Sequence, residues 1–315
     1  MSKLRLQGLT AAVFTPWTRE GELHGEAIET QAAHLYAWGI RRVFVGGTTG
    51  ECTSLTVEER MALAERWCRV GREQQIEVIV HVGSNCLRDS QVLAKQAQRC
   101  GALAIAAFAP HYFKPDSVDA LVACCQQITS EAPELPFYYY DIPGMTGVKL
   151  SMPDFLQRAH DQIKSLAGLK FTNTDLVSYQ HCLLLDSGRY DILWGVDEML
   201  LAALACGACG AVGSSYNFAA PIYHRLWSAW AHGDCLQAQR EQYRAVQVIS
   251  LLSEYGYLAA AKCVMQVLGV EVGPVRLPLR SLQPDLQREL IGRLESLGFF
   301  DWIHRPYESR RSDSN

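Results

Sequence analysis

Lys170 is the residue of this chain whose setting most suggests chemistry. It lies in the short segment 168–172, Gly-Leu-Lys-Phe-Thr. Burial at the end of an apolar strand disfavours a charged ammonium, so a lysine held there is driven toward the neutral amine that attacks carbonyl carbons. The alternative is a lysine paired with a carboxylate, which is the commoner use of such a residue. The segment makes Lys170 a candidate imine-forming nucleophile.

A tyrosine that could move protons lies upstream, in the segment 137–143, Phe-Tyr-Tyr-Tyr-Asp-Ile-Pro. A phenol can act as a general acid or base when it lies within hydrogen-bonding reach of the reacting group. Because side chains alternate along a strand, only one of Tyr139 and Tyr140 can face the interior. Tyr140 is the candidate proton carrier, and a core tyrosine with a satisfied hydroxyl is the alternative.

Residues 46–51, Gly-Gly-Thr-Thr-Gly-Glu, form a glycine-rich turn between an expected strand and an expected helix. Glycines let backbone amides approach a ligand, and the Thr48 and Thr49 hydroxyls can donate hydrogen bonds to a carboxylate or a phosphate. The turn lacks the lysine and the spacing of nucleotide-binding loops. A plain connection between strand and helix is the alternative.

Polar residues farther along could hold a polyhydroxylated molecule. Asp197 and Glu198 follow Gly195 directly after an expected strand, and their carboxylates can accept hydrogen bonds from hydroxyl groups. Capping of a helix is the alternative for Asp197. Thr172 and Ser214 carry hydroxyls but are uninformative individually. The nine histidines show no metal-binding spacing, so we assign no metal and no cofactor.

The elements that must position these residues alternate regularly. Helix-like stretches, such as 56–72 with a Thr56 and Glu59 capping box, separate eight short strand-like runs. Alternating strands and helices with strands apolar on both faces predict a closed (β/α)8 barrel, whose strand carboxyl ends carry the chemistry. The expected strands are 10–15, 42–45, 77–82, 103–109, 136–140, 166–170, 192–194 and 210–213.

Three regions follow from this pattern. Residues 1–221 are the expected catalytic barrel. Residues 222–300 show helical periodicity alone, over 222–232, 235–254, 258–268 and 284–297, and predict a helical extension. Residues 301–315 end in a polar stretch without apolar periodicity and predict a disordered tail.

Composition excludes several classes of function. The chain has 315 residues, 49% of them hydrophobic, and a formal net charge of −4, which gives no basic surface for nucleic acid or an anionic membrane. A small-molecule substrate is the better expectation. The first residues lack a secretory apolar run, and the eleven cysteines form no regular framework, so we expect free thiols and a cytoplasmic location.

Taken together, the motifs resemble the pyruvate-dependent lyases that include dihydrodipicolinate synthase and N-acetylneuraminate lyase, from about residue 9 to 297. The blocks most resemble the N-acetylneuraminate lyase branch. The resemblance implies a (β/α)8 barrel that cleaves N-acetylneuraminate (sialic acid) reversibly to N-acetylmannosamine and pyruvate, without a cofactor and as a homotetramer. The matching blocks are 139–143, 146–149, 168–172, 195–198 and 213–217.

The resemblance also implies roles. Lys170 would form an imine with the keto carbon, and the protonated imine would accept electrons as a carbon–carbon bond breaks. Tyr140 would move the proton at the substrate hydroxyl, and Thr48 and Thr49 would hold the carboxylate. The sugar chain would be contacted by Thr172, Gly195, Asp197, Glu198 and Ser214.

The chain departs from the family pattern at three places. Asp141 stands where Asn or His is expected, and a carboxylate there could raise the pKa of Tyr140. Tyr112, in a segment that only partly matches, is a candidate relay tyrosine supplied to a neighbouring subunit. The substrate-binding arginine of dihydrodipicolinate synthase is replaced in the region of Gly144 and Met145. Another 2-keto-3-deoxy sugar acid aldolase, and a barrel that has lost catalysis and acts as a binding protein, remain the alternatives.

Overall fold

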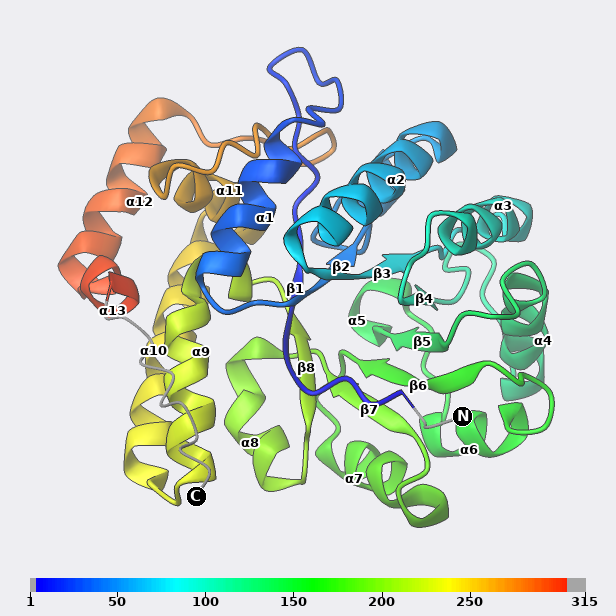
Figure 1. Cartoon of the computed structure of the whole chain (residues 1–315). Coiled ribbons are helices and arrows are strands. Elements are labelled where there is room, and N and C mark those ends of the chain that lie inside the picture. Colours follow the sequence, from blue (N-terminus) through cyan, green and yellow to red (C-terminus); the bar gives the residue numbers. More distant parts are fainter. Residues whose placement is uncertain (1–3, 305–315) are drawn as a thin grey trace.

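Eight parallel strands close into a barrel in the order β1 to β8, and helices surround it (Figure 1). The computed structural model describes residues 4–304. The strands are β1 (Gly8–Ala12), β2 (Arg42–Val45), β3 (Glu77–His81), β4 (Ala104–Ala107), β5 (Phe137–Asp141), β6 (Leu166–Phe171), β7 (Asp191–Trp194) and β8 (Gly210–Gly213). The predicted (β/α)8 barrel is confirmed, and each strand overlaps its predicted range.

The helices follow the strands in turn. They are α1 (Ala27–Ala37), α2 (Val57–Gln74), α3 (Leu87–Arg99), α4 (Val118–Thr129), α5 (Pro143–Thr146), α6 (Met152–Ala159), α7 (Leu176–Leu184), α8 (Leu200–Ala205), α9 (Tyr216–Ala231), α10 (Cys235–Glu254), α11 (Tyr257–Val267), α12 (Pro284–Leu297) and α13 (Phe299–His304). The predicted capping box of α2 is present, because the Thr56 side chain accepts from the Glu59 amide and the Glu59 carboxylate accepts from the Thr56 amide.

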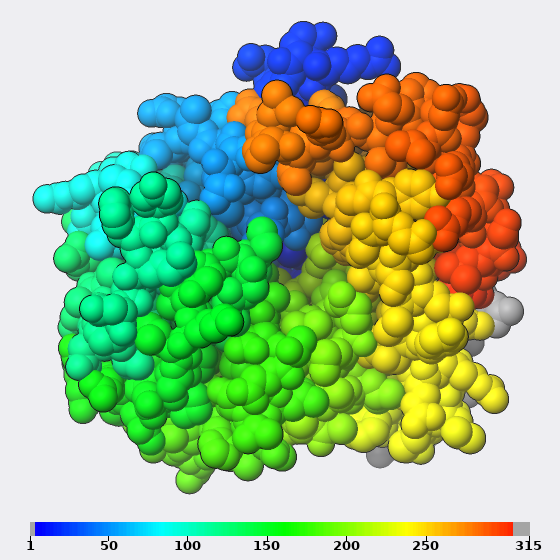
Figure 2. Space-filling model, turned by 180° about the vertical axis from the view of Figure 1, so that it is seen from behind, coloured from blue at the N-terminus to red at the C-terminus, as the bar shows by residue number. Residues whose placement is uncertain are grey.

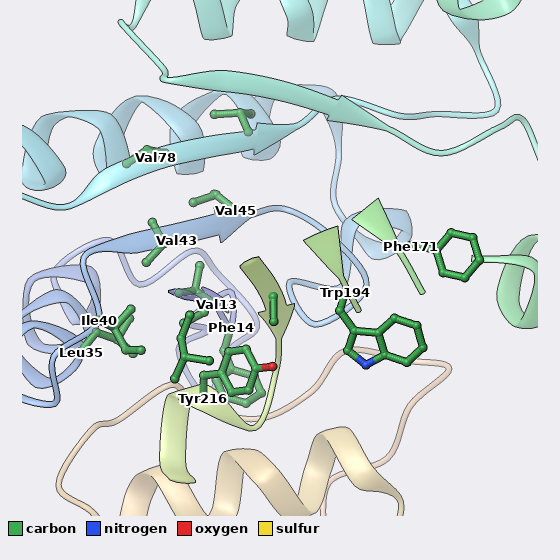
Figure 3. Close-up of a cluster of buried hydrophobic side chains, with 14 of the residues drawn as sticks. Val13, Phe14, Leu35, Ile40, Val43, Val45, Val78, Phe171, Trp194 and Tyr216 are labelled. Atoms are coloured by element: carbon green, nitrogen blue, oxygen red, sulfur yellow. The ribbon is translucent and has the colours of Figure 1, made fainter. Parts of the chain in front are cut away.

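The alternation of side chains along the strands makes two separate apolar layers. Inside the barrel, Phe44, Ile79 and Tyr138 belong to one buried cluster. Their neighbours on the same strands, such as Val43 and Val78, point outward into a larger core between strands and helices. Figure 3 shows part of this outer core. Burial on both faces explains why the strands are apolar throughout.

The helices after the barrel pack along one side of it (Figure 1). Helix α9 follows β8 and spans residues 216–231, so the predicted division at 221 falls inside one helix. The helical periodicity read from residue 222 missed the first turns of this helix, which begins directly after β8 and continues through Pro221. The predicted tail from 301 is also wrong over its first residues, which form α13; the rest of that prediction, 305–315, lies outside the described residues.

Among the described residues, no single helix is long and apolar enough to cross a membrane, although α10 and α11, bent by 112° relative to one another, pass that test as a pair by length and composition only. All eleven cysteines are free, and three of them, Cys86, Cys209 and Cys235, are exposed. Within residues 4–304, no group of three or more His, Cys, Asp or Glu side chains could hold a metal ion.

Candidate active site

A cavity of about 720 Å³ opens at the carboxyl ends of the strands. Figure 2 shows the hollow near the centre of the face, where the blue, green and yellow to orange parts of the chain meet. Its walls bring together all nine residues that we predicted to be catalytic or substrate-binding. These are Thr48, Thr49, Tyr140, Lys170, Thr172, Gly195, Asp197, Glu198 and Ser214.

Lys170 lies on β6 and points into the barrel interior, because its neighbours Leu169 and Phe171 belong to the outer core. The residue is 4% exposed. Its Nζ lies 3.8 Å from the centroid of the Tyr140 ring and 4.3 Å from that of Phe44. No carboxylate within residues 4–304 forms an ion pair with it. The alternative interpretation, a lysine paired with a carboxylate, is therefore not supported in the described part of the chain.

Tyr140 faces the interior, as alternation predicts, while Tyr139 points outward against Phe155. The Tyr140 hydroxyl lies 3.2 Å from Thr48 Oγ1, within hydrogen-bonding distance. The Tyr140 ring thus lies beside the amine of Lys170, and its hydroxyl lies beside that of Thr48 in the turn after β2. A small keto acid at this point would meet all three groups.

Asp197 supplies a buried carboxylate. Its Oδ2 accepts hydrogen bonds from the Ser215 amide and hydroxyl, at 2.9 Å and 2.5 Å, while its Oδ1 has no hydrogen-bond partner among the described residues. Burial raises the pKa of this carboxyl to about 6, and the Ser215 hydrogen bonds oppose that shift. A Cβ at Gly213 would collide with the carboxylate, so glycine is required there. The Tyr216 phenol also interacts with this carboxylate, so Asp197 is an acceptor that its neighbours hold in place on the cavity wall.

The Thr172 hydroxyl is a second buried group without a partner in the described part of the chain. A Cβ at Gly195 would collide with its Oγ1, so this glycine is needed for the hydroxyl to occupy its position. Buried polar groups are seldom left unpaired in folded proteins. Two such groups on one cavity wall are available to form hydrogen bonds with a molecule that enters the cavity.

The C-terminal extension completes the cavity, which the sequence did not predict. The Tyr257 hydroxyl, at the start of α11, lies 2.8 Å from Ser214 Oγ. Ser253 and the segment 278–280 also line the cavity. Glu51, at the end of the turn after β2, is a further lining residue that we had not singled out. The positions in the C-terminal extension carry no local sequence signal, because only the packing of distant segments brings them here, whereas Glu51 belongs to the glycine-rich motif itself.

Tyr112 lies apart from the other candidates. Its side chain is 77% exposed and does not line the cavity, whereas its neighbour His111 does. The Asn85 side chain holds this loop by accepting from both backbone amides, at 2.8 Å and 3.0 Å. A single chain does not test a contribution to a neighbouring subunit, so the relay role of Tyr112 stays a prediction.

Asp141 points away from the cavity, on the same outward face of β5 as Tyr139. Its carboxylate accepts a hydrogen bond of 3.2 Å from the Asn173 side chain. Burial raises the pKa of Asp141 to about 7, and Asn173 opposes the shift. The Asp141 charge raises the pKa of Tyr139, whose own burial acts in the same direction and more strongly. The Asp141 carboxylate therefore interacts with Asn173 and Tyr139, on the outward side of the strands.

The sequence profile of the dihydrodipicolinate synthetase family matches residues 5–297 of this chain. Among curated proteins, N-acetylneuraminate lyase from Rattus norvegicus is 38% identical over 304 residues, covering 95% of each chain. N-acetylneuraminate lyase from Danio rerio is 42% identical over 279 residues, covering 87% of this chain and 91% of that protein.

Solved structures that are similar to this chain include two further N-acetylneuraminate lyases. The N-acetylneuraminate lyase of Proteus mirabilis has a TM-score of 0.91 at 38% identity, covering 94% of this chain and all of that one. The N-acetylneuraminate lyase (sialic acid aldolase) of Aliivibrio salmonicida has a TM-score of 0.91 at 39% identity, covering 95% and 98%.

Proposed function

Because this chain belongs to the dihydrodipicolinate synthetase family, we propose that it is an N-acetylneuraminate lyase, a carbon–carbon lyase that cleaves N-acetylneuraminate reversibly to N-acetylmannosamine and pyruvate. One observation carries the proposal. The unpaired amine of Lys170, the phenol of Tyr140 and the hydroxyl of Thr48 meet in one cavity whose far wall presents unpaired acceptors.

The reaction begins at Lys170. Its amine adds to the keto carbon of the open-chain sugar acid, and uptake of one proton with loss of water leaves a protonated imine. This cation accepts the electron pair of the bond between the third and fourth carbons as that bond breaks. The electrons come to rest in a neutral enamine, so no unstabilised carbanion forms. Protonation of the enamine carbon and hydrolysis of the imine then release pyruvate and restore the amine.

Tyr140 handles the proton that must leave as the bond breaks. Cleavage turns the hydroxyl on the fourth carbon into an aldehyde. The phenolic oxygen of Tyr140 accepts the proton of that hydroxyl as the phenol gives up its own proton, which ends on the enamine carbon. Thr48 lies within hydrogen-bonding distance of that oxygen and can orient it. We assign Thr48 and Thr49 to the substrate carboxylate, where hydroxyl donors of a glycine-rich turn suit an anion.

The sugar end determines which acid is cleaved. The free Asp197 Oδ1 and the exposed Glu198 carboxylate can accept hydrogen bonds from chain hydroxyls, and Thr172 can donate or accept one. Gly195 and Ser214 lie beside them in the same wall. A site built to pair hydroxyls discriminates strongly against analogues that lack them, since its buried polar groups are then left unpaired.

Pyruvate release from N-acetylneuraminate tests the substrate. The purified protein is compared with N-acetylneuraminate and with 2-keto-3-deoxygluconate, which shares the keto acid but has a shorter chain. We expect a kcat/KM at least about 100-fold higher for N-acetylneuraminate, the size of discrimination that unpaired polar groups produce. Equal or reversed values would assign the protein to another 2-keto-3-deoxy sugar acid aldolase, and no release from either would favour a binding protein.

A homotetrameric assembly and a cytoplasmic location remain predictions that the resemblance and the sequence suggest. Sedimentation velocity of the purified protein gives the assembly directly. A species of four chains supports the prediction, and a monomer contradicts it.

A further inference from the structure

A buried ion pair lies behind the cavity wall, where the turn after β2 meets the C-terminal extension. Lys262 of α11 and Glu51 are joined by 2.8 Å between Nζ and Oε1, and their side chains are 3% and 0% exposed. The Lys262 ammonium also donates to the Thr15 carbonyl at 2.9 Å and the Pro274 carbonyl at 2.7 Å. All three donors of the ammonium are therefore used.

Glu51 is equally constrained. Its Oε1 accepts from the Trp17 indole at 3.1 Å, and its Oε2 accepts from the Arg276 amide at 2.8 Å. Its backbone has a φ of 55°, a left-handed conformation that a non-glycine residue adopts only when its surroundings hold it there. The Glu51 amide donates to the Thr48 carbonyl at 3.0 Å, which closes the turn that carries Thr48 and Thr49.

We infer that Glu51 and Lys262 are positioning residues, whose ion pair fixes the Thr48 and Thr49 turn against the C-terminal helices so that both hydroxyls face the substrate carboxylate. The inference rests on the proposed function, which assigns the carboxylate to those two threonines. It gives the C-terminal extension a part in catalysis that its position outside the barrel does not suggest.

The contacts argue for positioning rather than for general stability. A buried ion pair is a poor source of stability, because apolar residues of similar volume do as well or better. The contacts of this pair, whose Glu51 lines the cavity, instead join several segments that are far apart in the sequence. They are the chain after β1 at Thr15 and Trp17, the turn after β2 at Glu51, helix α11 at Lys262, and the C-terminal loop at Pro274 and Arg276.

The charges of Glu51 and Lys262 also support a role in substrate binding. Glu51 lines the cavity that would receive an anionic substrate, and an uncompensated carboxylate there would repel it. Lys262 supplies the compensating charge from the side away from the cavity. Burial lowers the pKa of Lys262, and the neighbouring Glu51 carboxylate opposes that shift. Removing Lys262 should therefore harm anion binding more than removing the charge of Glu51.

Borohydride trapping of the pyruvate imine tests the inference without the sugar half of the site. The trapped fraction is measured against pyruvate concentration for the full chain and for Glu51→Gln, Lys262→Met and the double variant. We expect Glu51→Gln to raise the half-saturating pyruvate concentration about tenfold and Lys262→Met to raise it further, since displacements of about 1 Å can cost on the order of 100-fold. The double variant should recover part of the loss, and trapping at saturation should stay complete.

Glu241 offers a matched control, because it is a second buried carboxylate, paired with Arg225 and Arg244 at 2.9 Å and 2.8 Å and absent from the cavity wall. Glu241→Gln should lower thermal stability without changing the half-saturating pyruvate concentration. If the Glu51 and Lys262 variants bind pyruvate as the wild type does at a temperature where all are folded, the inference is overturned.

Thr49→Val separates this inference from the proposed function. We expect it to raise the half-saturating pyruvate concentration as the ion-pair variants do. If Thr49→Val and Thr48→Val both leave that concentration unchanged, the turn does not hold the carboxylate, and both the assignment of Thr48 and Thr49 and the positioning inference fail, while pyruvate release from N-acetylneuraminate still tests the proposed function. If the threonine variants weaken pyruvate binding and the ion-pair variants do not, the positioning inference alone fails.

Discussion

Tyr140 and Lys170 are register partners on the neighbouring strands β5 and β6, and the Lys170 Nζ lies 3.8 Å from the centroid of the Tyr140 ring. Register partners on parallel strands point to the same face of a sheet, so both side chains enter the barrel side by side. The strand register alone therefore places a proton carrier beside the nucleophile, independently of how the surrounding helices pack. The pairing of two strands thus builds the reacting pair.

Replacing Tyr140 by phenylalanine should separate imine formation from cleavage of the carbon–carbon bond. Tyr140→Phe keeps the ring beside Lys170 but removes the hydroxyl, so turnover of N-acetylneuraminate should fall by about 100-fold to 10,000-fold, the usual contribution of a general acid or base. Imine trapping with pyruvate should persist. Steady-state rates and borohydride trapping measure the two effects, and turnover within a few-fold of wild type would remove Tyr140 from the mechanism.

Tyr138→Phe is the matched control for that experiment. Tyr138 faces the same interior two residues earlier, and its hydroxyl donates to Asp191 at 2.8 Å instead of lining the cavity. The change should cost about 1–3 kcal/mol in the free energy of unfolding, because a buried carboxylate loses a donor. Turnover should remain near wild type at temperatures where the variant is folded.

Gly213→Ala should damage recognition of the sugar while sparing pyruvate. The new methyl group would collide with the Asp197 carboxylate, which must then move from its place on the cavity wall. We expect KM for N-acetylneuraminate to rise about tenfold or more, with pyruvate trapping little changed. Gly292→Ala, in α12 with open space around it, should instead add about 0.5–1 kcal/mol of stability and leave KM unchanged. An unchanged KM in Gly213→Ala would contradict the role given to Asp197.

Asp141 should make the protein less stable as pH rises. Its folded-state pKa of about 7 lies above its ordinary value of 3.8, so the folded state binds this proton more tightly than the unfolded state. The resulting stabilisation is complete below about pH 4 and is lost as pH rises through 7. Asp141→Asn, which stays neutral, should remove up to about 4 kcal/mol of this pH dependence and be more stable than wild type at pH 8.

Denaturant unfolding at pH 5 and pH 8 measures that effect, with Asp116→Asn as an exposed control that should follow wild type. Turnover by Asp141→Asn should stay close to wild type, because the carboxylate faces away from the cavity. A large loss of turnover would show that Asp141 acts on Tyr140 after all.

The barrel and much of its site were predictable because their signals are local. Strand alternation predicted that only one of Tyr139 and Tyr140 faces inward, the family resemblance pointed to Tyr140, and the strand ends gave the place of Lys170 and of the turn at Thr48. Residues that follow strand ends converge in any closed parallel barrel. Local pattern, barrel geometry and family resemblance together were therefore sufficient for these positions.

The contributions of the extension were not predictable in this way. Tyr257 and Lys262 lie on an ordinary amphipathic helix, and nothing near them in the sequence tells that one meets Ser214 and the other Glu51. Long-range packing decides both contacts. The division at residue 221 failed because helix α9 begins at Tyr216, before the helical periodicity that the sequence shows from residue 222.

The central claim is that Lys170 forms the imine, and one measurement tests it most directly. The protein is mixed with pyruvate, reduced with borohydride and digested, and the modified peptide is identified by mass spectrometry, with Lys170→Ala in parallel. We predict one reduced pyruvate per chain, on the peptide that contains Lys170, and none in the variant. An unmodified wild-type protein, or an adduct on another lysine, would contradict the account.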